Sequence, residues 1–233
     1  MDSIFIGMEN VSLVDYEGKI ACSLFVGGCN FRCPFCHNSE LVLNCHEYQH
    51  IKEEDIFAYL ESRRKVLDAV VISGGEPTMY KALPDFVRKV KDMGFLVKLD
   101  TNGTNPDMIK YLVQNKLIDY IAMDIKNSIS KYPLTAGVKD LTIHNIQESV
   151  DYIMSCGIDY EFRTTLVAGH HTAQDMQEIA EWLTGAKRLF LQHFDDKGAN
   201  IQQGLTAIDK DTAPSFVEIV KKHIQNVSLR GYN

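Results

Sequence analysis

Short apolar runs alternate with segments of helical periodicity along most of this chain, and this alternation restricts the folds open to it. An apolar run of about 4–8 residues between turn residues is typical of a buried strand. An amphipathic segment between two such runs is typical of the crossover helix in a βαβ unit. The predicted strands are Ser23–Gly27, Ala69–Ser73, Phe95–Asp100, Tyr120–Asp124, Tyr160–Leu166 and Arg188–Gln192, followed by a short one at Val227–Arg230. The predicted helices are Lys52–Lys65, Leu83–Met93, Pro106–Asn115, Asn145–Cys156, Thr172–Leu183 and Ala213–Gln225.

Six core units are fewer than the eight that close a barrel. The sequence therefore predicts an α/β fold, an incomplete (β/α)6 TIM-like barrel with parallel strands. With 233 residues and no linker tract, the chain is expected to form one domain over residues 1–233, with an N-terminal extension over about residues 1–20. The segment Ile4–Val14 alternates weakly, and we expect it to pair as a small hairpin or to cover the barrel end.

Local signals support these helix boundaries. Gly94 and Gly157 stand directly after predicted helices, where a left-handed residue commonly ends a helix. Asn105 precedes Pro106, as an N-cap precedes a first-turn proline.

Composition excludes several classes of protein. The net charge is −7, and no basic stripe is present, so nucleic acid is not an expected partner. The chain has no apolar run long enough for a membrane span and does not open with a basic n-region and an apolar h-region, so we expect a cytoplasmic protein that does not contact the membrane. The six cysteines are then expected to be metal ligands and thiols, not disulfides. Cys22 and Cys156 are expected to be buried thiols, whereas Cys45 stands in a polar stretch.

Three cysteines, Cys29, Cys33 and Cys36, are spaced C-x3-C-x2-C in one short loop. Closed zinc sites and ordinary iron–sulfur clusters normally use four protein ligands. Three cysteines therefore suggest a [4Fe–4S] cluster with one iron open to another molecule. His37 could complete a Cys3His zinc site, but its side chain is adjacent to that of Cys36 and would have difficulty reaching the same tetrahedral ion.

The cysteine loop resembles that of the radical S-adenosylmethionine enzymes, with Phe35 as the aromatic residue before the last cysteine. The following His37 and Asn38 extend the resemblance to the branch that activates glycyl radical enzymes. The stretches Asp15–Ala21 and Phe25–Cys29 resemble the approach to the cluster in activating proteins of anaerobic ribonucleoside-triphosphate reductase, and pyruvate formate-lyase activating enzyme is also similar.

This resemblance implies two cofactors, a [4Fe–4S] cluster and S-adenosylmethionine (SAM). The implied reaction generates a 5′-deoxyadenosyl radical, which abstracts a hydrogen atom from a backbone glycine of a partner enzyme. The partner is expected to be anaerobic ribonucleoside-triphosphate reductase, or alternatively pyruvate formate-lyase or another glycyl radical enzyme. A flavodoxin or a ferredoxin-type protein is the expected electron donor.

Further motifs follow the predicted strands, where ligand-binding groups gather in parallel α/β folds. Two glycines in the first motif allow close approach to a ligand, here the ammonium of SAM. Carboxylates at consecutive strand ends need a cation between them, and a lysine can neutralise the ligand carboxylate. The motifs are Ser73-Gly74-Gly75-Glu76, Asp100-Thr101-Asn102 and Asp124-Ile125-Lys126.

By resemblance, Asp100, Thr101 and Asp124 are expected near a monovalent cation, and Lys126 at the methionyl carboxylate. Arg163 occupies the place of a family arginine that faces the ligand. The motif containing Gln192 and His193 departs from the family pattern, so either residue could replace the histidine that contacts adenosine.

Two rival functions remain open on the sequence. A radical enzyme acting on a small molecule is the first, although the chain lacks a cysteine-rich insertion for extra clusters. A non-enzymatic iron–sulfur or zinc module is the second, and it would leave the strand-end motifs unexplained. His170 and His171 are adjacent, and we expect them to lie in an exposed loop.

Overall fold

The computed structural model describes residues 3–196, 198 and 200–232. Two compact units make up the chain, and each is described separately. The first unit comprises Met1–Asn30, Glu40–Thr101 and Asn105–Ala122. The second comprises Phe31–Ser39, Asn102–Thr104 and Met123–Asn233.

The first unit is built on four strands, in which hydrogen-bonded order follows chain order. β1 pairs antiparallel with β2, whereas β2, β3 and β4 are parallel neighbours. The strands are β1 (Phe5–Ser12), β2 (Ala21–Val26), β3 (Ala69–Gly74) and β4 (Leu96–Thr101). Its helical segments are α1 (Ser39–Leu43, of which the first residue belongs to the second unit), η1 (Cys45–Glu47), α2 (Glu53–Ser62), η2 (Pro77–Met79), α3 (Leu83–Asp92) and α4 (Pro106–Gln114).

The helices of this unit bury apolar stripes, as amphipathic helices packed on a sheet do. α2 buries Ile56 and Leu60, and α4 buries Ile109 and Leu112. The central strand β3 is apolar through Val70, Val71 and Ile72 and becomes polar only at its carboxyl end. The body of the strand is therefore buried in the core, and the polar motif that begins at Ser73 lies at its carboxyl end.

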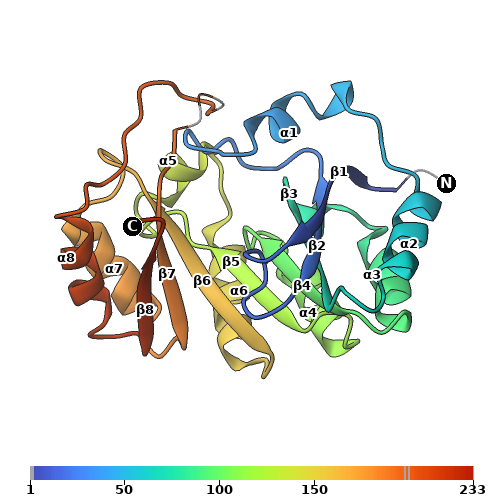
Figure 1. Cartoon of the computed structure of the whole chain (residues 1–233). Helices are drawn as coiled ribbons and strands as arrows, with labels where there is room; N and C mark the ends of the chain where they lie inside the picture. Colours follow the sequence, from blue (N-terminus) through green and yellow to red (C-terminus); the bar gives the residue numbers. More distant parts are fainter. Residues whose placement is uncertain (1–2, 197, 199, 233) are drawn as a thin grey trace. The chain divides into compact units, whose positions relative to one another are not determined.

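The second unit contains three parallel strands, again in chain order. Figure 1 shows α7 and α8 side by side against β7 and β8, at the red end of the chain. The strands are β6 (Asp159–Leu166), β7 (Arg188–His193) and β8 (Asn226–Arg230). The helices are α5 (Tyr132–Ala136), α6 (Ile143–Ser155), α7 (Ala173–Trp182) and α8 (Ala213–Val220). β5 (Tyr120–Asp124) begins in the first unit and ends in the second.

The predicted strands and main helices are confirmed to within a few residues. Gly94 and Gly157 are left-handed, with φ of 91° and 87°, and the Asn105 side chain caps α4 by accepting from the Met108 N–H. β1 confirms the hairpin expected at the N-terminus. The prediction for the last helix is wrong at its end, because α8 stops at Val220 and turns follow it.

Two features of the fold were not predicted. α1 and α5 have only five residues each, too few to show a helical period.

Within the described ranges, no helix is long and apolar enough to cross a bilayer. The single-domain assignment stays a prediction.

Candidate active site

The cysteine loop begins in the first unit, where β2 ends in Gly27 and Gly28 immediately before Cys29. Gly28 has a φ of 68°, a left-handed conformation that favours glycine. Its N–H donates to the carbonyl oxygen of Leu41 at 2.8 Å, and the Tyr80 hydroxyl donates to that of Gly27 at 2.6 Å. The backbone before the first cysteine is thus fixed on both sides.

The Gly-Gly-Glu turn packs directly on this backbone. A Cβ added to Gly75 would lie only 1.6 Å from the carbonyl oxygen of Gly28. The N–H groups of Gly75 and Glu76 donate to the carbonyls of Val26 and Gly28 at 2.9 and 3.0 Å. Gly75 is therefore required for the close approach of β3 to the residue before Cys29. This contact is a role for the glycine that the sequence did not indicate.

Glu76 joins the ends of β3 and β4. Its side chain is buried, and Oε1 accepts from the hydroxyl of Thr78 at 2.6 Å and from that of Thr101 at 2.8 Å. A buried carboxylate is tolerated when such donors satisfy it. The structure thus brings together two predicted site residues, Glu76 and Thr101, through a direct hydrogen bond.

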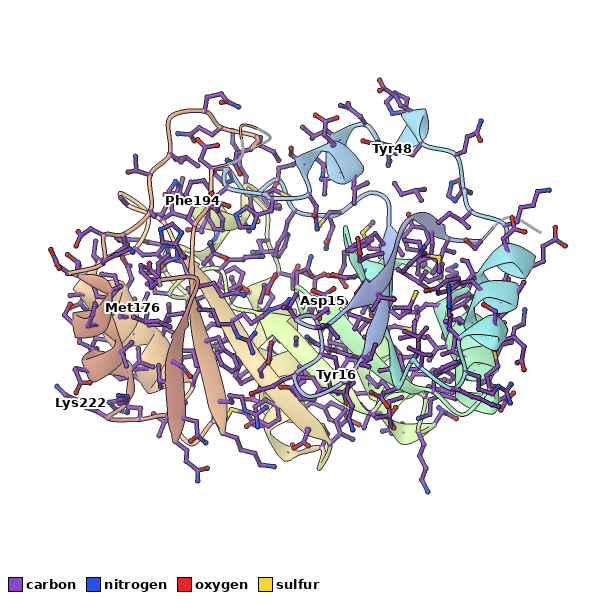
Figure 2. The ribbon with its side chains drawn as sticks, in the orientation of Figure 1. Asp15, Tyr16, Tyr48, Met176, Phe194 and Lys222 are labelled. Carbon is purple, nitrogen blue, oxygen red and sulfur yellow. The ribbon has the colours of Figure 1, made fainter. Side chains whose placement is uncertain are left out.

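Asp100 lies beside a cation that the sequence analysis did not single out. Lys98 Nζ lies 3.5 Å from Asp100 Oδ1, and its side chain is only 5% exposed. Lys98 also donates to the carbonyl oxygen of Asp15 and lies over the Tyr120 ring; Figure 2 labels Asp15 in the connection between β1 and β2. The Ser73 hydroxyl donates to the other carboxylate oxygen of Asp100 at 2.9 Å. A lysine between the apolar residues Val97 and Leu99 of β4 was the available sequence signal.

In the second unit, Cys33 and Cys36 are held by α5. The Arg32 N–H donates to the carbonyl oxygen of Ala136 at 2.9 Å, and the Cys36 N–H donates to that of Cys33 at 3.1 Å. A Cβ on Gly137, which ends α5 with a φ of 67°, would lie 2.2 Å from the Arg32 carbonyl oxygen. The unpredicted helix α5 is therefore a support of the cysteine loop.

Burial favours the neutral thiol form of both cysteines in the protein without metal. Burial raises the pKa of Cys33 to about 11, and burial also raises the pKa of Cys36. Lys126 acts in the opposite direction on both groups. Since thiolates are the form that binds metal, the charge of bound iron would reverse the cost of burial. These soft sulfur donors fit an iron–sulfur cluster. No group of three or more His, Cys, Asp or Glu side chains among the described residues is arranged to hold a metal ion.

Asp124 lies between two cations of the same unit. Lys126 Nζ is 2.8 Å from Asp124 Oδ2, and Arg163 Nε is 2.9 Å from Asp124 Oδ1. Burial opposes ionisation of Asp124, but Arg163 and Lys126 outweigh it and hold the pKa of this carboxyl well below its usual range. Burial likewise disfavours the charged form of Lys126, yet Asp124 raises its pKa. Asp124, Lys126 and Arg163 thus form a fully charged triad, and each strand-end carboxylate has its own protein cation.

Phe35 is the centre of an aromatic cluster in the second unit. Its ring lies edge-to-face with His170, His171 and Phe194, at centroid distances of 5.9, 6.2 and 6.5 Å. The ring of His37 stacks on Phe194 at 5.7 Å. Phe194, labelled in Figure 2, is 2% exposed and follows β7 directly.

The end of β7 differs from what the sequence suggested. Phe194 contacts the cysteine loop, whereas His193 lies edge-to-face with Tyr232 at 4.8 Å. Gln192 is half-buried on β7. The ring contact of His193 is therefore with the C-terminal Tyr232 and not with the cysteine loop. Phe194 was missed, although an aromatic residue at a strand end was visible in the sequence.

Several other expectations need correction. His171 is 2% exposed, so the prediction that it lies in an exposed loop is wrong; His170 is half-buried. Cys22 is fully buried as expected, but Cys156 is only half-buried. Cys45, also half-buried, packs its Cβ against Gly27. In Asn102, the side-chain oxygen accepts from the N–H of Thr104 at 3.0 Å, so this residue shapes the turn after β4.

Comparison with known proteins defines the class. The model of the radical SAM superfamily matches residues 23–183. The "Putative glycyl-radical enzyme activating enzyme MJ1227" of Methanocaldococcus jannaschii is 34% identical, over 100% of this chain and 98% of that protein. A second protein of that organism with the same designation, MJ1632, is 32% identical over 98% of this chain and 87% of its own length.

Solved structures agree on the fold. A radical SAM methyltransferase from Sphaerobacter thermophilus has a TM-score of 0.72 at 18% identity, covering 92% of this chain and 67% of that one. The predicted α/β class, an incomplete barrel with parallel strands, is confirmed.

The chain belongs to the radical SAM superfamily. It is therefore an enzyme, and its cofactors are those of the superfamily, a [4Fe–4S] cluster and SAM. The zinc module and the non-enzymatic iron–sulfur module are excluded with this assignment. The roles of the individual site residues stay predictions.

Proposed function

We propose that this enzyme activates a glycyl radical enzyme by removing a hydrogen atom from one backbone glycine of that partner. The observation that carries the proposal is the end-to-end match to a relative designated as such an activating enzyme. We further propose anaerobic ribonucleoside-triphosphate reductase as the partner, on the resemblance of Asp15–Ala21 and Asn30–Cys36 to its activating proteins.

In this proposal, Cys29, Cys33 and Cys36 hold the cluster and leave one iron for SAM. When bound, the reduced cluster and SAM supply the 5′-deoxyadenosyl radical, with the electron delivered by a flavodoxin or a ferredoxin-type donor. The protein binds and orients SAM and excludes water from the site. Asp100, Thr101 and Asp124 are the proposed ligands of a monovalent cation.

Other site residues are proposed to position SAM. Its carboxylate pairs with Lys126, and its ammonium lies at the turn from Ser73 to Glu76. Arg163 pairs with the carboxylate oxygen of Asp124 that Lys126 does not contact, and it helps to keep Asp124 ionised. Phe35, His37 and Asn38 are proposed to line the SAM site beside the cysteines. Phe194 packs against the rings of Phe35 and His37.

The decisive experiment follows the hydrogen atom. Reconstituted protein, reductant and SAM are mixed with anaerobic ribonucleotide reductase whose glycine residues carry deuterium at Cα. We expect a glycyl radical by electron paramagnetic resonance (EPR) and one deuterated 5′-deoxyadenosine per radical, because only an inserted glycine loop holds its Cα near the reacting carbon. Pyruvate formate-lyase labelled in the same way tests the alternative partner. Deuterium arriving only from a labelled free nucleotide or amino acid would establish a small-molecule substrate instead.

Lys126→Met is expected to weaken SAM binding by about 1–3 kcal/mol, the loss of a charge-assisted contact. Iron content should stay at the wild-type value. The matched control is Lys131→Met, which removes an equally short ion pair, with Asp175 at 2.7 Å, from the same unit. Anaerobic calorimetry with SAM measures both variants. Equal affinity in wild type and Lys126→Met would refute the role of Lys126.

A further inference from the structure

Three successive carbonyl groups, beginning with the last residue of β5, each accept a hydrogen bond from a side chain. The Tyr132 hydroxyl donates to the Asp124 carbonyl oxygen at 3.1 Å, and the Thr164 hydroxyl donates to that of Ile125 at 2.9 Å. His171 Nε2 lies 2.9 Å from the carbonyl oxygen of Lys126. The backbone that carries Lys126 is therefore fixed from three elements, α5, β6 and the connection between β6 and α7.

The tautomer of His171 follows from its second hydrogen bond. Nδ1 lies 3.1 Å from the Val167 backbone nitrogen, which has only an N–H to offer, so Nδ1 is the acceptor. The ring proton is then on Nε2, which donates to the backbone carbonyl oxygen of Lys126. Burial lowers the pKa of His171, in keeping with a neutral ring that uses both nitrogens.

The same ring also meets the cysteine loop. It lies edge-to-face with Phe35 at a centroid distance of 6.2 Å. Phe35 is buried, and it stands between Cys33 and Cys36 in the sequence. One buried imidazole thus contacts both the proposed SAM-binding segment and the loop that carries two cluster ligands.

We propose that His171 is a positioning residue for cofactor binding, which holds the backbone of Lys126 through Nε2 and packs its ring against Phe35. The proposal rests on the role given above to Lys126. It concerns neither a ligand of the cluster nor a group that contacts SAM. A histidine that the sequence placed in an exposed loop becomes part of the support of the site.

Two substitutions separate the two ring nitrogens. In His171→Asn the polar atoms of the amide lie one bond beyond Cγ, as Nδ1 does. The amide can therefore still accept from the Val167 N–H but cannot reach the carbonyl oxygen of Lys126. In His171→Gln the amide nitrogen lies one bond further out, as Nε2 does, and can donate to the carbonyl oxygen of Lys126. His170→Gln is the matched control, since that ring is equally near Phe35 at 5.9 Å but its side chain has no hydrogen bond within the described part of the chain.

Reconstituted variants are compared by SAM calorimetry and by amide hydrogen exchange of the peptide spanning residues 124–128. We expect His171→Asn to bind SAM about ten-fold more weakly, as loss of one buried hydrogen bond predicts, with about ten-fold faster exchange and full iron content. His171→Gln should recover both to within about three-fold, and His170→Gln should match wild type.

Equal losses in the asparagine and glutamine variants would overturn the proposal, as would protection of residues 124–128 in His171→Asn. If the asparagine variant does not fold, Tyr132→Phe removes the neighbouring bond to Asp124. Unchanged exchange and affinity there, together with weak binding by His171→Gln, would also overturn it. If wild type binds no SAM, the proposed function fails, while hydrogen exchange still tests the positioning role separately.

Discussion

Replacement of Cys29, Cys33 or Cys36 by alanine is expected to abolish the cluster. Wild-type protein purified without oxygen should bind about four irons per chain. Two remaining thiolates cannot hold a cubane whose fourth iron already has no protein ligand, so each variant should retain less than about one iron. Iron analysis and EPR of the reduced protein measure the loss, and SAM cleavage should disappear with it.

The other cysteines supply the controls for this experiment. Cys156→Ser changes a half-buried thiol whose Sγ lies 3.4 Å from the Ile153 carbonyl oxygen, and it should keep all iron. Cys22→Ser and Cys45→Ser are also expected to retain the cluster. Loss of iron in Cys45→Ser would contradict the open site, because it would indicate a fourth protein ligand. Wild-type protein that holds zinc and resists iron reconstitution would contradict the cluster itself.

Gly75→Ala is expected to destabilise the protein strongly and to reduce iron loading. The new methyl would lie 1.6 Å from the Gly28 carbonyl oxygen, a backbone atom that cannot rotate away. Relief requires β2 and β3 to separate at their carboxyl ends, which moves the residue before Cys29. Overpacking of this kind lowers the free energy of unfolding by about 3 kcal/mol. Urea unfolding and iron analysis of the variant measure the two effects.

Gly7→Ala is the matched control, because its Cβ would meet the Phe25 Cβ at an ordinary 3.4 Å. This variant should load iron normally and change the unfolding free energy by less than about 1 kcal/mol. A Gly75→Ala protein with wild-type stability and iron content would show that the approach of β3 to Gly28 is looser than described. Both variants lie in the first unit, so the comparison does not depend on the second.

Strands and long helices could be predicted because their signals are local. Val70, Val71 and Ile72 form a short, β-branched apolar run, which is typical of a buried strand. Gly94 ends a helix for a reason carried by the residue itself, its freedom to adopt positive φ. α5 carries no such signal, since five residues show no period and its position depends on contacts with the cysteine loop.

The sequence by itself determined the cofactor chemistry, because the spacing of Cys29, Cys33 and Cys36 is a property of one short loop. It also placed Asp100 and Asp124 at strand ends, since strand periodicity is local. Only the tertiary structure decided which groups support them. Lys98 beside Asp100, Phe194 on His37 and His171 on Lys126 are contacts between distant parts of the chain or between side chains whose direction depends on packing. Burial and hydrogen bonding of such groups arise only when the elements assemble, so a local pattern can show that these residues are present but not which groups they contact.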